Sequence, residues 1–273
     1  MKIFSYITLS FALLFLASCQ DVINVNLNTA APRLVIDAAI NWQKGTDGSV
    51  QKIILSTTTD FYSTITPKVS GATVSIKNSE NMNYIFSEIP NTGEYQCTTF
   101  KPIIGETYIL TVVYKAETYT ATETMQSVSS IDAIQQKNNG GFTGKDYEIE
   151  VSFKDPPAKN FYMAKFFPEI FKVPSYGIIS DEYTNGNAKS WTYSDSDLKE
   201  GNKIAITHYG ISQAYYNYMN KLISIASSSG GGSPFQTPPA TVRGNIVNKT
   251  HNDNYALGYF SLNEVDSRNY IIQ

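Results

Sequence analysis

The sequence predicts a mainly β protein made of two antiparallel β-sandwich domains, with one helix in the second domain. Three observations support this class. Aromatic residues make up 13% of the 273-residue chain and charged residues only 16%, and aromatic side chains suit the half-buried surface of a sheet. Apolar and polar residues alternate along many short segments, which is the period of a strand. Turn-forming residues separate these segments at the short intervals typical of a sandwich.

The first domain is expected to span residues 32–126. Alternating apolar residues begin at Leu34 and recur around Ile53, Val74 and Tyr108, with glycine- or asparagine-containing turns between them. Strands of this kind bury one face and expose the other. The pattern therefore predicts a sandwich core formed by every second residue.

The second domain is expected to span residues 127–273, because the alternation pauses near Ser127 and resumes at residues 147–154. That strand ends at Asp155-Pro156-Pro157, and residues 160–167 are expected to form its hairpin partner. A strand, an Asp-Pro corner and a second strand in this order also occur in immunoglobulin- and fibronectin-like sandwiches. We therefore expect both domains to be of this type.

One segment, near residues 212–227, has a helical period instead. Its apolar residues lie three and four positions apart and so share one helical face; they are Tyr215, Tyr218, Met219, Leu222, Ile223 and Ala226. Ser212 is the expected N-cap. We expect this face to pack against the core rather than to contact a partner.

The first residues of the chain have the pattern of an export signal. Lys2 supplies a positive charge and is followed by an apolar run, as in a secretory signal peptide. The run is shorter than the roughly 20 apolar residues of a membrane-spanning helix. We therefore expect a signal peptide at residues 1–18, followed by a tether at residues 19–31.

The end of this signal matches the lipobox of bacterial lipoproteins. It consists of Leu16, the small residues Ala17 and Ser18, and then Cys19. Small side chains let a peptidase reach the bond before the cysteine, and only a thiol can form the thioether to a diacylglycerol. We therefore expect lipid attachment at Cys19, an ordinary secretory signal being the alternative. Cys97, the other cysteine, then has no disulfide partner and is expected to be a small buried thiol in a strand.

The sequence contains no recognisable catalytic or metal-binding motif. Its two histidines, His208 and His251, lack the spacing of a zinc site. Phosphate-binding loops, nucleophile elbows and dinucleotide-binding glycine patterns are also missing. We expect no cofactor, no metal and no enzymatic activity. The net charge of −3 provides no basic surface for nucleic acid.

Two groups of acidic residues could serve a hydrolase, because glycosidases need two carboxylates on opposite sides of a sugar. They are Asp181-Glu182 and Asp195-Ser196-Asp197, and both lie among loop-forming residues, which favours solvated turns. An envelope hydrolase acting on glycans or peptides is the alternative. It requires these carboxylates or His208 to converge in one pocket.

Aromatic residues are concentrated in the second half of the chain. They include Tyr176, Tyr183, Trp191, Tyr193, Tyr209, Tyr215 and Tyr216. Exposed Tyr and Trp side chains are favoured at interfaces and can stack on ligands. Trp191 and Tyr193 are flanked by polar residues, so we expect them in a loop, as candidate contacts for a ligand or partner. Packing in a sandwich core is the alternative.

Short motifs also follow one another along the chain in a characteristic order. They are Leu34–Ile40, Val69–Val74, Gly93–Tyr95, Gly105–Leu110, Tyr119–Ala121, Ile131-Asp132, Asp155-Pro156, Asn245-Ile246 and Gly258–Phe260. In this order, and with its lipobox cysteine, the chain resembles the Bacteroidetes outer-membrane lipoproteins of domain-of-unknown-function family 4249. The chain departs from the family at Asp37-Ala38, where members tend to have an acidic residue followed by glycine.

The resemblance implies a location and a partner but no catalytic residue, because none is established for the family. Its members are typically encoded beside TonB-dependent outer-membrane transporters. This implies a non-catalytic accessory protein that captures a small-molecule, sugar or peptide cargo for such a transporter. We expect a lipid-anchored protein of the outer membrane, on the cell surface rather than at the periplasmic face. A purely structural envelope lipoprotein is the remaining alternative.

Overall fold

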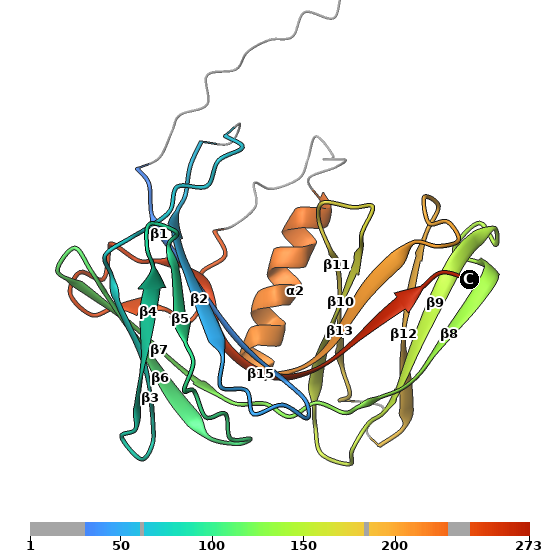
Figure 1. Ribbon diagram of the computed structural model, residues 1–273, viewed down its shortest axis with the longest axis horizontal. Coiled ribbons are helices and arrows are strands. Elements are labelled where there is room, and N and C mark those ends of the chain that lie inside the picture. Colours follow the sequence, from blue (N-terminus) through green and yellow to red (C-terminus); the bar gives the residue numbers. More distant parts are fainter. Residues whose placement is uncertain (1–30, 61–62, 183–185, 229–240) are drawn as a thin grey trace, which may run out of the picture. The chain divides into compact units, whose positions relative to one another are not determined.

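The computed structural model describes residues 31–60, 63–182, 186–228 and 241–273. Residues Pro32–Gln273 form one compact unit, drawn in Figure 1. Strands make up most of its regular structure, and α2 (Gln213–Ser228) is the helix. The strands are β1 (Leu34–Gln43), β2 (Gln51–Thr57), β3 (Thr73–Asn78), β4 (Asn83–Ile89), β5 (Glu94–Cys97), β6 (Thr107–Tyr114), β7 (Glu117–Thr124), β8 (Ile131–Gly140), β9 (Asp146–Lys154), β10 (Phe161–Pro168), β11 (Ser175–Ser180), β12 (Ala188–Asp195), β13 (Lys203–Ile211), β14 (Val247–Asn248) and β15 (Leu257–Ile271).

These strands form two sheets. Twelve strands form one sheet in the order β11-β10-β13-β15-β1-β2-β5-β4-β3-β6-β7-β14, and the other contains β12-β9-β8. Neighbouring strands are antiparallel except for β1 and β15, which run parallel. The protein is therefore a mainly antiparallel β-sandwich with one described helix, and the predicted fold class is confirmed.

The first core lies between the strands of the N-terminal half. Leu34, Ile36, Ala38 and Ile40 of β1 all face this core, as their alternation predicted. Cys97 is 2% exposed at the end of β5, which confirms the buried thiol. The intervening residues of β1 point to the opposite face of the sheet, where the candidate site lies.

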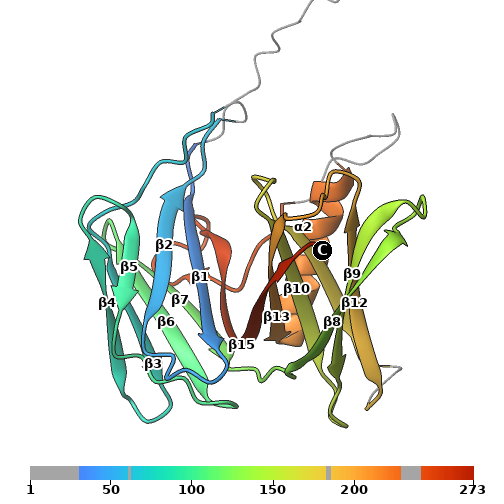
Figure 2. The ribbon, with the colours of Figure 1, turned by 45° about the vertical axis from the view of Figure 1, so that its right-hand side comes forward.

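The second core lies between β12-β9-β8 and the β10 end of the large sheet (Figure 2). β9 and β10 face each other across it, with the rings of Phe153 and Tyr162 5.1 Å apart. The predicted hairpin between residues 147–154 and 160–167 is therefore wrong, because β9 pairs with β8 and β12. Asp155 stabilises the corner at which the chain changes sheets, since it accepts hydrogen bonds from Tyr162 Oη at 2.6 Å and the Gly186 N–H at 3.0 Å.

Strand β15 takes part in both cores. Residues 257–265 pair with β1, and residues 265–271 pair with β13. Phe260 lies in the first core, and Tyr270 packs against the second. The expected boundary between residues 126 and 127 stays a prediction.

Helix α2 covers the face of the large sheet that points away from the second core. A third apolar cluster lies beneath it, with Met163, Tyr209, Ile211, Met219 and Val265 as its buried members. Ser212 Oγ accepts a hydrogen bond from the Tyr215 N–H at 3.1 Å, so the predicted N-cap and helix are confirmed. In the described parts of the chain, no helix has both the length and the hydropathy needed to cross a bilayer.

The predicted lipoprotein signal lies outside the described residues. This holds for Leu16, Ala17, Ser18 and Cys19, and for all but the last residue of the expected tether at 19–31. Those predictions therefore stay predictions.

Candidate functional site

Trp191 and Tyr193 lie in strand β12 and not in a loop. Trp191 is 7% exposed, and its Nε1 donates a hydrogen bond to His208 Nδ1 at 3.1 Å. Tyr193 is half-buried and stacks on Phe166, with ring centroids 4.9 Å apart. The predicted loop is therefore wrong, because both side chains are oriented toward the second core. Trp191 retains little surface for a ligand.

The first acidic pair is divided between the interior and the surface. Asp181 is fully buried, and its Oδ2 accepts a hydrogen bond from the Asn160 N–H at 2.7 Å. Glu182 is exposed and forms an ion pair with Lys159 at 3.0 Å. The prediction of a solvated turn is therefore wrong for Asp181.

The other candidates for catalysis do not converge on these two. Asp195 and Asp197 lie at the end of β12 and in the exposed turn after it. His208 is enclosed in the second core, where burial lowers its pKa to about 3, so it is neutral at physiological pH. Across the described ranges, no three His, Cys, Asp or Glu residues are placed to hold a metal ion.

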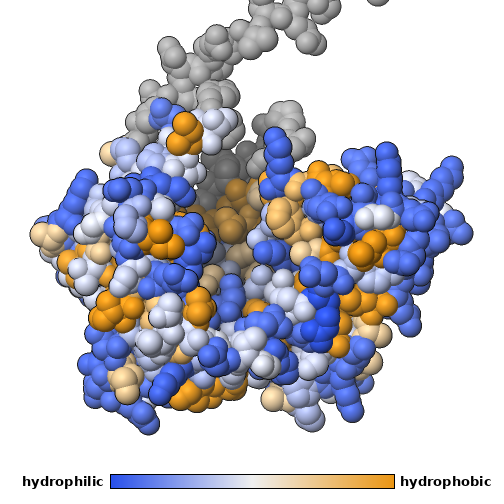
Figure 3. All heavy atoms as spheres, in the orientation of Figure 1, coloured by the Kyte–Doolittle hydropathy of each residue, from blue (hydrophilic) through white to orange (hydrophobic). Residues whose placement is uncertain are grey.

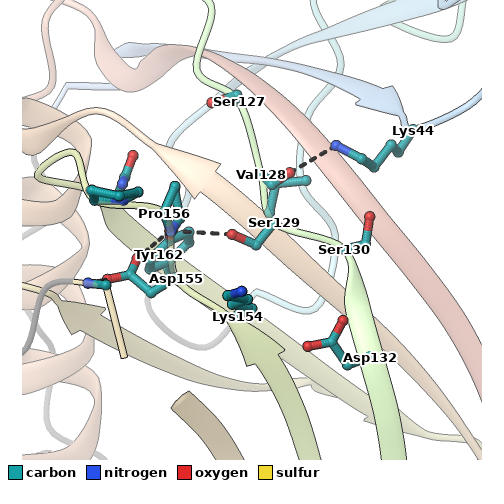
Figure 4. A pocket seen from close by; sticks show the side chains of 13 residues that line it. Lys44, Ser127, Val128, Ser129, Ser130, Asp132, Lys154, Asp155, Pro156 and Tyr162 are labelled. Carbon is teal, nitrogen blue, oxygen red and sulfur yellow. Dashed lines mark hydrogen bonds between the residues drawn. The ribbon is translucent and has the colours of Figure 1, made fainter. Parts of the chain in front are cut away.

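One cavity, of about 540 Å³, lies where the chain passes between the two cores. We call it the junction cavity; it is lined by Lys44, Ser127, Val128, Ser129, Ser130, Asp132, Lys154, Asp155, Pro156, Pro157, Asn160, Tyr162 and Gly186. Some of its polar groups hydrogen-bond one another, as the dashed lines in Figure 4 show. Lys44 Nζ donates to the Val128 carbonyl at 2.9 Å, and Ser129 Oγ lies 3.4 Å from Tyr162 Oη. These contacts indicate a structural junction.

A second cavity, of about 480 Å³, lies beside α2 on the face of β1 that points away from the first core. We call it the tyrosine groove. It is lined by Val35, Asp37, Ala39, Asn41, Met163, Lys165, Tyr176, Tyr209, Tyr215, Tyr218, Met219, Leu222, Gly258, Tyr259 and Asn263. Figure 3 shows the surface hollowed, with hydrophobic residues deep in the hollow. Its volume is within the roughly 300–1,000 Å³ of small-ligand sites.

Two parts of the large sheet and α2 surround the groove. β1 and β15 supply one wall, and their register places Asp37 beside Tyr259. β10, β11 and β13 supply the opposite wall, where Lys165 pairs across strands with Tyr176. α2 covers one side with Tyr215 and other residues of its apolar face.

Asp37 is the carboxylate of the groove. Its side chain is exposed to solvent but lies within the groove, among the other lining residues. This partial burial raises the pKa of Asp37 above its usual value, although the Ala39 N–H and the charge of Lys52 act in the opposite direction. A raised pKa means that the surrounding protein groups do not fully stabilise the negative charge of the carboxylate.

The pKa values of several groove tyrosines are raised in the same electrostatic environment. Burial is the first cause that raises the pKa values of Tyr176, Tyr215 and Tyr218, and the charge of Asp37 raises all three further. These residues come from β11 and α2. The Asp37 charge therefore acts across the groove, and the hydroxyl groups stay protonated as hydrogen-bond donors.

Asn263 is 1% exposed at the bottom of the groove. Its Nδ2 donates to Asn41 Oδ1 at 3.0 Å and to Ser261 Oγ at 3.1 Å. Its Oδ1 has no hydrogen-bond partner in the part of the chain that the structure describes. Buried polar atoms are normally paired, so this oxygen keeps an unused hydrogen-bond acceptor position.

Part of this site was visible in the sequence. Tyr176, Tyr209 and Tyr215 belong to the aromatic-rich segment, and the apolar face of the helix includes further lining residues. Asp37 and Lys165 were missed, because each lies alone in its strand without a partner nearby in sequence. The available signal for Asp37 was its position opposite the buried face of the first strand.

The fold and the groove together define a β-sandwich protein with an open cleft rich in tyrosine. The chain belongs to the family described as Domain of unknown function (DUF4249), whose model matches residues 20–269. This agrees with the family that the sequence motifs resemble. Among curated proteins, none matches the chain.

Solved structures that match the chain share little sequence with it. A two-domain fibronectin type III segment of chicken tenascin is 13% identical and covers 58% of this chain and 83% of its own, with a TM-score of 0.22. The FN1–FN3 domains of chicken CNTN1 are 12% identical, with coverages of 67% and 60% and a TM-score of 0.23. A DUF4785 family protein of Legionella pneumophila is 10% identical, with coverages of 65% and 52% and a TM-score of 0.27. Scores this low carry no argument about function.

Proposed function

We propose that this protein is a non-catalytic, lipid-anchored capture protein of the Bacteroidetes outer membrane that works with a TonB-dependent transporter. The tyrosine groove carries this proposal, because it combines aromatic walls with a few inward-facing polar groups such as Asp37 and Asn263. This is the usual composition of a small-ligand site. Cargo held there is delivered to the transporter.

The dispersion of the candidate catalytic residues supports binding over hydrolysis. Asp181, Glu182, Asp195, Asp197 and His208 line neither the junction cavity nor the tyrosine groove. A general acid or base must lie within hydrogen-bond reach of the proton it transfers. The groove itself holds one carboxylate, whereas a glycosidase needs two that face each other.

The lipobox at Leu16, Ala17, Ser18 and Cys19 supports the membrane anchor. Two or more acyl chains hold a protein stably on a bilayer. Tethering raises the effective concentration of the captured ligand beside a transporter in the same membrane, so a modest affinity suffices. The family resemblance supports the transporter as partner and the cell surface as location.

Substitution of Cys19 tests the anchor. Cys19→Ala should move the protein from the membrane fraction to the soluble fraction, because no thioether can form. Cys97→Ala is the matched control, since Cys97 is the other cysteine and lies buried in the first core. Detergent-phase partitioning of both variants measures the effect. Membrane retention of Cys19→Ala equal to that of the control would refute lipidation.

A mild-detergent pull-down tests the transporter. The lipidated protein, purified from cells that express the neighbouring transporter, should recover it in amounts that mass spectrometry detects. Recovery of no outer-membrane transporter would contradict the proposal and favour a purely structural lipoprotein. Cleavage of the protein on intact cells by added protease should place it on the cell surface, whereas protection would place it at the periplasmic face.

A further inference from the structure

The tyrosine groove contains two opposite charges that form no ion pair with the described residues. Within the described residues, neither the Asp37 carboxylate nor the Lys165 ammonium takes part in an ion pair. Lys52, the cation that acts on Asp37, is itself paired with Glu94 at 3.1 Å. Among the described residues, the groove therefore has one anionic and one cationic side chain that no protein charge pairs.

These charges lie on opposite walls. Asp37 belongs to β1, whereas Lys165 belongs to β10 and pairs with Tyr176 of β11. Both side chains line the same cavity, Asp37 from β1 and Lys165 from β10. A ligand that satisfies both charges must carry a cationic group at one end and an anionic group at the other.

The remaining lining residues add two further requirements. Among the described residues, Asn263 Oδ1 is buried without a partner, so it is available to accept a hydrogen bond from a ligand N–H or O–H. Tyr176 is 39% exposed and provides a ring face for apolar or cationic groups. Met219 and Leu222 of α2 supply an apolar surface.

We propose that the tyrosine groove binds a short peptide with free termini, the terminal ammonium at Asp37 and the terminal carboxylate at Lys165. A peptide N–H then donates to Asn263 Oδ1, and side chains pack on the tyrosines and on α2. This ligand class rests on the capture role proposed above. A neutral glycan pairs neither charge, so the groove discriminates against it.

Calorimetric titration with a tripeptide and its blocked derivatives tests the ligand. The tripeptide Ala-Leu-Ala should bind wild-type protein. N-acetylation removes its ammonium and C-amidation removes its carboxylate, and each should weaken binding by at least about tenfold, because each leaves a partner charge unpaired in the groove. These arms use the unaltered protein, so they do not depend on the folding of a variant.

Variants then assign each end of the peptide. Asp37→Asn should reproduce the loss seen on N-acetylation, and Lys165→Met the loss seen on C-amidation. N-acetylation of the peptide should weaken its binding to Asp37→Asn almost no further, because this variant already lacks the interaction with the terminal ammonium. Asp132→Asn is the matched control, because Asp132 is an exposed strand aspartate outside the groove, and its affinity should equal that of wild type.

The results separate this ligand class from the capture role. No binding of Ala-Leu-Ala at millimolar concentration, or equal binding of the free and blocked peptides, would overturn the peptide proposal. Binding of maltotriose in its place would overturn the peptide proposal and leave capture intact. Peptide binding together with a pull-down that recovers no transporter would support the peptide site and contradict the role beside a transporter.

Discussion

At the scale of single residues, Asp37 is a carboxylate whose ionised form is less favourable in the folded protein than in water. Partial burial raises its pKa in the folded state. The unfolded value is about 3.9, so the folded state binds the proton more tightly than the unfolded state does. Ionisation at neutral pH therefore lowers the free energy of unfolding.

Asp37→Asn should consequently raise the thermal stability of the ligand-free protein at neutral pH by a small amount. The gain should shrink as pH falls through the raised pKa and vanish below about 3.9, where the wild-type residue is protonated in both states. Melting temperatures measured across this range test the effect. The charged or titratable side chains that face Asp37 are Lys52, Lys165, Tyr176, Tyr209, Tyr215, Tyr218 and Tyr259.

Asp132→Asn again provides the control, because Asp132 is an exposed strand residue that lies outside the groove. Its melting temperature should follow wild type at every pH. A neutral-pH loss of stability in Asp37→Asn would mean that the carboxylate has a structural partner, and it would argue against a ligand-binding role.

At the scale of elements, β1 performs two tasks with its two faces. Ile36 and its neighbours at alternate positions close the first core, whereas Asp37 and its neighbours line the groove. The pairing with β15 holds both faces in register and places Gly258 opposite Ile36. Gly258 has φ +94°, and a Cβ there would lie 2.0 Å from the Ile36 carbonyl oxygen.

Gly258→Ala should therefore lower the free energy of unfolding by more than its backbone conformation alone explains. Gly201→Ala is the matched control, since Gly201 has φ +87° and nothing within 4 Å of an added Cβ. Gly201→Ala should lower the free energy of unfolding by about 1–2 kcal/mol, because a residue with a Cβ is strained in a left-handed conformation. Urea titration measures both, and equal costs would show that β1 and β15 separate without strain.

At the scale of the whole molecule, β15 links the first core to the second. Phe260 lies in one and Tyr270 packs against the other, within a single strand. Loss of either core would leave half of this strand without its packing partner. We therefore expect residues 32–273 to unfold as one cooperative unit.

Matched substitutions in the two cores test this cooperativity. Ile53→Ala in the first core and Ile204→Ala in the second each remove a fully buried side chain and should cost about 2–5 kcal/mol. Both should move one shared calorimetric transition to lower temperature, with the calorimetric and van't Hoff enthalpies equal. Two separate transitions, each sensitive to one variant, would show that the cores are independent.

Local pattern was enough to predict the class of fold and several of its parts. The alternation from Leu34 onward predicts which face of β1 is buried, and the helical period after Ser212 predicts α2. Cys97 also lies buried as its strand phase indicates. These predictions succeed because periodicity reports which side of an element meets the core, whatever that core contains.

Tertiary structure decided how the strands pair and where the groove lies. Residues 160–167 were expected beside 147–154, yet they lie across the core, because strand partners depend on contacts distant in sequence. For the same reason Trp191 became a core residue. Asp37 and Lys165 share a groove only because β15 aligns β1 with β13 and β10. The sequence by itself determined the faces of the elements, and long-range pairing determined which faces meet.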